Sequence, residues 1–452
     1  MTNTEERKDF NKVYWRFLWS SILIALSGCL GNVVDAIIVG NLIDENGVSA
    51  INMSKPYVQF IFTLSMLLST GAGMLVGKEL GRKDIARAAY IYTLSIALCM
   101  TFGLLMTLCG IFIPDAITGI LCDPTHTFLY EPTFTYLRIT LLGTPVFMLM
   151  WALCTMAGVD GSPRLVSFAI LIDNAVNLSC DIIFIKFLDM GIAGSSLATV
   201  VGHLVGIAIM CWHFHYKDNH LHLGLGHSSS PLWKGIKDIL SEGAPLAIAS
   251  ICLTLLLFSS NSIMLSSLGR VGIFAFAVCM NLLQIYNLCL AGVCRTIQSL
   301  GSVQVGKGDN EAFSLVLHKS FVFITWAMII TCIFIWIDPE SVTRLFGAKE
   351  DDLINEGSKA LRIYALSLIP FCYIYTLMVV YKLYSYHKMA LFLSFALSLT
   401  VIPVLWLVSH LAPSLLWYSF LIAYAIEAVL IVIFHRLGHL KFELAAPKKE
   451  GE

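Results

Sequence analysis

Long apolar stretches recur along the whole chain and are separated by short polar segments. Each stretch has about 20 residues or more, which is enough for one α-helix to cross a hydrocarbon core of about 30 Å. The pattern predicts an all-α polytopic membrane protein with twelve transmembrane helices. Their expected ranges are 14–39, 55–77, 88–112, 133–157, 163–187, 191–213, 239–264, 272–300, 315–337, 358–383, 388–410 and 414–436.

The composition agrees with this pattern, because 57% of the residues are hydrophobic and only 13% are charged. Soluble domains carry about 25% charged residues. The lipid bilayer is therefore the expected surrounding. No basic patch with interleaved aromatic residues indicates nucleic acid, and the 13 cysteines form no CxxC pair or metal-binding pattern. We expect a monomer without a cofactor.

The distribution of Lys and Arg predicts the orientation. About 20 of them fall in segments on the side shared by both termini, and about six fall on the opposite side. Cytoplasmic segments carry the excess of positive charge. We therefore expect an integral protein of the inner or plasma membrane with both termini in the cytoplasm.

The two halves of the sequence repeat each other. A shift of about 225 residues superimposes segment 81–84 (GRKD) on 306–309 (GKGD) and Pro145 on Pro370. Six helices per half give both halves the same orientation in the membrane, as in parallel repeats. The two prolines interrupt their helices at matched places and are candidate hinges, although a static bend is the alternative.

This repeat predicts two pseudo-symmetric six-helix bundles around a central cavity. The expected lobes are 1–215, which holds the ion site, and 237–452, which ends in a cytoplasmic tail. A hydrophilic cytoplasmic linker over 216–236 joins them.

Polar side chains interrupt three predicted helices of the first half. Asp35 lies in an apolar run, and Asn177 and Asp181 share one face of the fifth helix because they are four residues apart. A carboxylate at membrane depth costs at least about 2.5 kcal/mol and marks an ion or substrate path. Asp181 and Asp35 are expected about 9 Å from the outer end of their helices, and Thr199 about 12 Å in.

These four residues predict one coupling site at a common depth. Carboxylate, amide and hydroxyl oxygens suit a hard cation such as sodium, or a titrating proton. The matching positions of the second half hold no acid, which favours an ion site over structural polar contacts. Those positions are near Asn261, Ile402, Trp406 and Tyr424.

Other polar residues in the apolar segments are weaker candidates. His203 is either a second proton site or a satisfied interior histidine. No catalytic constellation is expected, and no metal beyond sodium at the coupling site. Candidates for lining a substrate cavity are Asp173, Asn174, Gln284 and Glu427.

Several motifs resemble the multidrug and toxic compound extrusion (MATE) transporters, and the resemblance covers nearly the whole chain. It is carried by segments 34–36 (VDA), 81–84 (GRKD), 158–164 (GVDGSPR), 177–181 (NLSCD) and 191–199 (GIAGSSLAT). The residues after Pro245 include no acid, so the chain is more similar to the DinF-like branch than to the NorM-like one. The first helix has no proline, unlike that of some relatives.

The resemblance implies secondary active multidrug efflux. Cationic amphipathic small molecules would leave in exchange for sodium or protons, and Asp35, Asn177, Asp181 and Thr199 would carry the coupling ion. Two alternatives stay open. A flippase for a lipid-linked saccharide would need several cations for the pyrophosphate, and Arg295 is the only deeply placed one. An intramembrane enzyme would use Asp35 and Asp181 as a catalytic pair.

Overall fold

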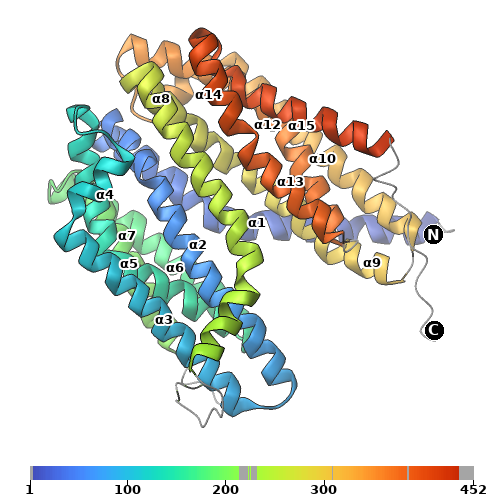
Figure 1. Ribbon diagram of the computed structural model, residues 1–452. Coiled ribbons are helices and arrows are strands. Elements are labelled where there is room, and N and C mark those ends of the chain that lie inside the picture. The colour runs from blue at the N-terminus through green and yellow to red at the C-terminus, as the bar shows by residue number, and fades with distance from the viewer. Residues whose placement is uncertain are drawn as a thin grey trace. The chain divides into compact units, whose positions relative to one another are not determined.

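The computed structural model describes residues 4–212, 222, 224, 232–307, 309–383 and 386–436, which form helices and short connections without a strand (Figure 1). Most of the predicted linker, 216–236, lies outside the described residues. The first half contains α1 (Thr4–Leu42), α2 (Glu45–Gly81), α3 (Ile85–Phe112), α4 (Pro114–Leu121), α5 (Thr127–Val159), α6 (Pro163–Ile182), the π-helical turn η1 (Ile183–Phe187) and α7 (Ile192–Met210). The second half contains α8 (Leu232–Thr296), η3 (Ile297–Gly301), α9 (Ser302–Lys307), α10 (Asn310–Ile337), α11 (Pro339–Leu345), α12 (Asp351–Leu383), α13 (His387–Leu399), α14 (Val401–Leu411), η4 (Pro413–Leu415) and α15 (Tyr418–Arg436).

These helices account for the twelve predicted membrane crossings. In the described part of the chain, nine helical segments are long and apolar enough to span a bilayer, and shorter apolar segments lie in α1 and α15. The 65-residue helix α8 contains two crossings, because the backbone of Gly269 adopts φ 59° and ψ −143° and breaks the helix. Helices α13 and α14 together form one crossing.

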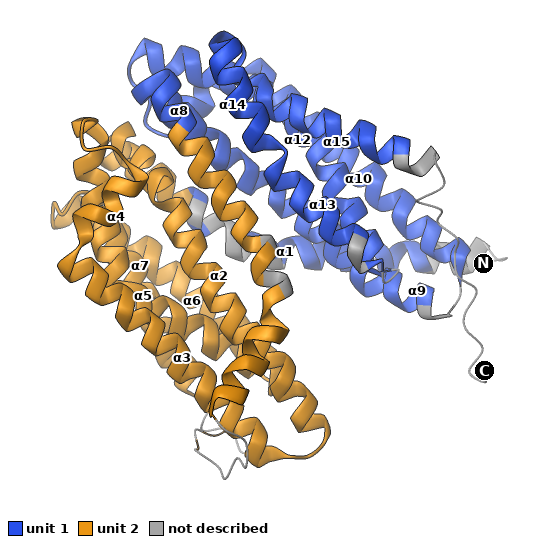
Figure 2. Ribbon diagram, in the orientation of Figure 1, with its two compact units in different colours: residues 1–33, 263–452 blue, residues 34–262 orange. Residues whose placement is uncertain are grey.

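The chain divides into two compact units, each described here by itself (Figure 2). Unit 2 is Val34–Ser262, and unit 1 is Met1–Val33 with Ile263–Glu452. The units therefore differ from the predicted lobes 1–215 and 237–452, since most of α1 clusters with unit 1 and the first part of α8 clusters with unit 2. The lobes as functional bodies stay a prediction.

Unit 2 has a core in which α2, α3 and α5 meet the first part of α8. Leu68, Leu137 and Met148 are among its fully buried side chains. Helices α2 and α8 approach most closely at Gly71 and Gly243, where a Cβ atom would collide with the facing backbone. Small residues allow membrane helices to approach this closely. The resulting van der Waals packing stabilises helix association inside a bilayer, where the hydrophobic effect does not drive it.

The predicted repeat is visible in the helix caps. Asp84 precedes α3 and accepts a hydrogen bond from the Arg87 backbone N–H at 3.0 Å. Asp309 precedes α10 and accepts one from Ala312 at 2.9 Å. Each side chain satisfies a donor that a helix start leaves free. Helices α4 and α11 are also matched, and each begins with a proline that suits the first helical position.

Pro145 and Pro370 lie inside the continuous helices α5 and α12. The Leu141 carbonyl cannot bond to Pro145, which lacks an N–H, and the Thr107 hydroxyl contacts it at 3.5 Å. The carbonyl that Pro370 leaves free is that of Leu366. The contact at Leu141 favours a static arrangement at Pro145, and the hinge role of both prolines stays a prediction.

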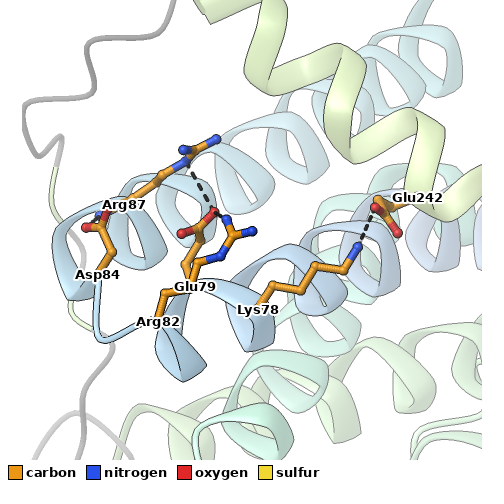
Figure 3. A network of polar contacts seen from close by, with 6 residues as sticks. All are labelled: Lys78, Glu79, Arg82, Asp84, Arg87 and Glu242. Atoms are coloured by element: carbon orange, nitrogen blue, oxygen red, sulfur yellow. Dashed lines mark hydrogen bonds and ion pairs between the residues drawn. The ribbon is translucent and has the colours of Figure 1, made fainter. Parts of the chain in front are cut away.

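A charged network closes the α2–α3 turn (Figure 3). The buried Glu79 carboxylate pairs with Arg82 at 3.2 Å and with Arg87 at 3.5 Å. Lys78 of α2 pairs with Glu242 of α8 at 2.6 Å. These charges lie at one end of the apolar helices, as expected for residues at the membrane surface.

Candidate functional site

The candidate site is built on the antiparallel hairpin of α6 and α7 in unit 2. Pro163 occupies the first turn of α6, and η1 follows directly after its last residue. Gly191 then adopts φ 56° and reverses the chain into α7. A Cβ atom on Gly194 would lie 2.9 Å from the Phe184 Cβ, so glycine permits the close start of the hairpin.

Polar side chains face one another along this hairpin at every fourth residue. Four residues advance an α-helix by about 6 Å and return to nearly the same face. The middle contact joins Asn177 to Thr199, whose Oγ1 accepts from the amide Nδ2 at 3.2 Å. The predicted pairing of these two residues is thus present in the structure.

The outer contact joins the two predicted acids, Asp35 of α1 and Asp181 of α6, whose carboxyl groups interact electrostatically. Asp181 is 0% exposed, and neither of its oxygens has a hydrogen-bond partner among the described residues. Asp35 accepts a bond from the Ser195 hydroxyl at 3.1 Å. Two neighbouring carboxyl groups can form a hydrogen bond only when one of them carries a proton.

Two residues that the sequence did not single out complete this group. Lys55 of α2 interacts electrostatically with Asp35. Tyr136 of α5 interacts with both Asp35 and Asp181. Two carboxylates beside one ammonium group would leave one negative charge uncompensated.

The inner contact of the hairpin joins a carboxylate to an imidazole. His203 Nδ1 lies 3.0 Å from Asp173 Oδ1, and both side chains are mostly buried. The ring of Phe147 in α5 meets the imidazole edge-on, with 4.6 Å between ring centroids. Asp173 therefore points at α7, while Asn174 beside it is half-buried. Their role in a substrate cavity stays a prediction.

The other two candidates for the substrate cavity lie in unit 1. Glu427 of α15 is 2% exposed, and its carboxyl oxygens face the Thr400 side chain. It borders a cavity of about 240 Å³ between α13 and α15, whose other walls include Phe392, Phe395 and Leu399. Gln284 of α8 is half-buried and does not line this cavity.

The donor set at Asp35 and Asp181 is compatible with sodium as well as a proton. Two carboxyl groups with the nearby Asn177 and Thr199 oxygens would supply hard ligands. No group of three or more His, Cys, Asp or Glu residues gathers anywhere in the described ranges. A sodium ion at these four residues stays a prediction.

Two regions of the chain match the sequence profile of the MatE family, residues 21–183 and 245–407. The two matches cover most of the chain and correspond to its two halves, as the repeat predicted. The chain is also 23% identical over 295 residues to the multidrug export protein MepA of Staphylococcus haemolyticus. The alignment covers 65% of this chain and 64% of that protein, which is less than two thirds of its length.

Solved structures share the fold. One, described as the inward-facing conformation of a multidrug resistance MATE family transporter of the MOP superfamily, superimposes with a TM-score of 0.80 at 18% identity. The superposition covers 92% of this chain and 98% of the chain of that transporter. An outward-facing structure of a transporter with the same description gives 0.69 at 19% identity and covers 95% and 96%. The match of both halves to one family profile decides the family: this chain belongs to the MatE family.

Proposed function

We propose that this chain is a secondary active transporter that exports cationic amphipathic compounds in exchange for protons. Three facts support a transporter rather than an enzyme: its family, the multidrug export protein among its relatives, and the transporters that share its fold. Solved structures of that fold in inward-facing and outward-facing forms support alternating access as the mode of transport.

The observation that carries the proposal is the buried carboxyl pair. Asp35 and Asp181 come from two helices and interact electrostatically, while Lys55 compensates only one charge. Neighbouring buried carboxylates resist ionising together without a counter-ion. A single proton would form a hydrogen bond between the two carboxyl groups and neutralise the group at once, which is why we favour a proton over sodium.

Proton binding and release would couple to the conformational change. With the proton bound, the group is neutral and its burial costs little. Without it, an uncompensated charge remains, and the form that exposes the pair to water is favoured. A pH difference of one unit contributes about 1.4 kcal/mol for each proton that enters. This energy supports a substrate gradient of about tenfold.

We assign the positive charge of the substrate to Glu427. Its carboxyl group lies in a cavity whose other walls are mainly apolar and include two phenylalanines. Apolar walls with one acidic group suit a lipophilic cation, since the hydrocarbon part is buried while the charges pair. Asn174 and Gln284 remain further candidates for contacts with the substrate, whereas the Asp173 carboxylate is directed at His203.

We keep the predicted topology, with both termini in the cytoplasm, and a monomeric state. With this orientation the Asp35–Asp181 pair lies in the outer half of the membrane. A proton could then enter from outside while the substrate leaves.

The test is ethidium transport in proteoliposomes with a proton gradient or a sodium gradient imposed separately. We expect transport that follows the proton gradient and is lost in Asp181→Asn. Asp189→Asn is the matched control, because Asp189 is exposed just beyond η1 and its positive φ of 52° is one that asparagine tolerates. Transport that followed only sodium would replace the proton in this account. Full activity in Asp181→Asn would refute the coupling site.

A further inference from the structure

We propose that Asp173 and His203 form a second proton-binding site, in series with the Asp35–Asp181 pair, so that two protons exchange for each substrate molecule. This inference rests on the proposed function. It goes further by assigning a role to the inner contact of the α6–α7 hairpin. It also fixes the number of protons and therefore the electrical character of the transport.

The geometry is that of a pair whose charge depends on one proton. His203 Nδ1 and Asp173 Oδ1 are 3.0 Å apart, with side-chain exposures of 19% and 9%. Imidazole is the side chain that changes charge near neutral pH. When His203 is protonated, the pair has no net charge. When it is neutral, a buried carboxylate remains with one negative charge.

The surrounding helices are shaped to hold this pair. A Cβ atom on Gly202 would lie 2.6 Å from Asp173 Oδ1 and 2.8 Å from the Asp173 carbonyl oxygen. One turn later, a Cβ atom on Gly206 would lie 2.6 Å from the Met150 methyl group. Glycine at both positions lets α7 come close enough for the carboxylate to sit between the helices. The Asp173 side chain is thus closely packed between the two helices.

The described parts of the neighbouring helices supply no second cation to Asp173. Among the described residues, the titratable group that faces it from α5 is the buried Cys154 thiol. From α7 it is His203 itself, and α5 adds the neutral Phe147 ring against the imidazole. The proton on His203 therefore decides whether the site is neutral.

The middle contact connects this pair to the outer one. Asn177 and Thr199 lie one helical turn from Asp173 and His203 and one turn from Asp181 and Ser195. Each step is about 6 Å along the helix. The amide and hydroxyl groups can relay hydrogen bonds, but they hold no charge. The hairpin thus offers two proton-binding stations with a polar bridge between them, and the second lies nearer the predicted cytoplasmic end of α6.

Two protons per substrate have an electrical consequence. Exchange of one monovalent cation for one proton moves no net charge, whereas exchange for two protons moves one charge inward. A membrane potential alone would then drive transport, to a gradient of about fiftyfold per 100 mV. Removing the inner station leaves an exchange that a pH difference drives and a potential does not.

The experiment measures ethidium export from proteoliposomes under two separate conditions. One is a pH difference with the potential clamped at zero. The other is a valinomycin–potassium potential, negative inside, at equal pH. Protein-free liposomes correct for passive movement of the dye. The proteins compared are the wild type, Asp173→Asn, His203→Gln and, as a control in the α4–α5 connection, His126→Gln.

We expect both conditions to drive transport by the wild type and by His126→Gln. Asp173→Asn and His203→Gln should keep the pH-driven transport, which also reports that they are folded, and lose the potential-driven transport. If either variant loses both, the double variant replaces it, because two amides preserve a hydrogen bond between the helices.

The outcomes separate the two proposals. Wild-type transport that responds to pH but not to potential would overturn the second station and leave proton antiport standing. Variants that respond to the potential as the wild type does would also overturn the second station and leave proton antiport standing. A wild type that responds to neither condition would refute the proposed function itself.

Discussion

The carboxyl groups of Asp35 and Asp181 interact electrostatically, although they belong to α1 and α6 and lie far apart in the sequence. The position that matches Asp35 in the second half is Asn261. Its amide donates to the Asn52 carbonyl at 2.8 Å, and the two side chains share a further bond of 2.9 Å. Of the two matched positions, Asp35 thus belongs to a pair of acids, whereas Asn261 forms uncharged hydrogen bonds between helices.

Replacing Asp35 by Asn should abolish coupled transport without removing substrate binding. The amide satisfies the contact to Asp181 but cannot exchange a proton. We expect pH-driven ethidium transport in proteoliposomes to fall at least tenfold, because removing a positioned proton-transfer group typically costs this much in rate or more. Dye binding in detergent should stay within twofold of the wild type. Undiminished transport would show that Asp35 is not part of the coupling site.

Replacing Asn261 by Ala should have the opposite profile. Asn52 and Asn261 are 1% and 2% exposed, so the change leaves the Asn52 amide without its acceptor. An unsatisfied buried polar group costs about 1–3 kcal/mol. We expect a lower melting temperature in detergent and unchanged transport per folded molecule. Loss of proton coupling at wild-type stability would mean that the two halves share the ion function.

Much of this account was accessible from the sequence. The length and periodicity of the apolar stretches predicted the helices, because hydrophobic thickness limits what can span a bilayer. The repeat aligned Asp84 with Asp309, and the structure shows that both cap a helix. Asn177 and Asp181 shared a face by spacing alone, and Thr199 was placed at their depth by counting residues.

Other features needed coordinates. Ser195 lies one turn from Thr199 on the same helix, so extending the four-residue pattern would have found it. Lys55 was assigned to the membrane surface because a lysine at a helix start usually reaches water. Its interaction with Asp35 depends on how α1 and α2 pack. The division of the helices between the two units also follows from packing, which a single sequence does not encode locally.

Replacing Gly202 by Ala should separate α6 from α7. The added methyl group would lie 2.6 Å from Asp173 Oδ1 and could not be accommodated without a shift of backbone or carboxylate. Such overpacking costs about 1–3 kcal/mol. We expect a measurable fall in thermal stability. Fluorescence-detected size exclusion after heating measures this fall. Gly119→Ala is the control, because a Cβ atom there meets nothing within 4 Å. Equal stability of the two variants would contradict the close packing described for the hairpin.

Replacing Glu427 by Gln should weaken recognition of charged substrates. The substitution keeps the shape of the side chain and removes the negative charge from the cavity between α13 and α15. We expect KM for ethidium to rise about tenfold, as loss of one partly desolvated ion pair implies. KM for a neutral lipophilic dye should change less than twofold. A parallel rise for both dyes would indicate a general change of the cavity and not loss of the cation partner.

The central claim is that the Asp35–Asp181 pair couples proton release to substrate binding. The most direct measurement adds ethidium to purified protein in weakly buffered detergent solution and records the protons released. The account predicts release from the wild type that matches Asp189→Asn and is clearly reduced in Asp181→Asn, with dye binding retained in all three. Equal proton release from the wild type and Asp181→Asn, at equal dye binding, would contradict it.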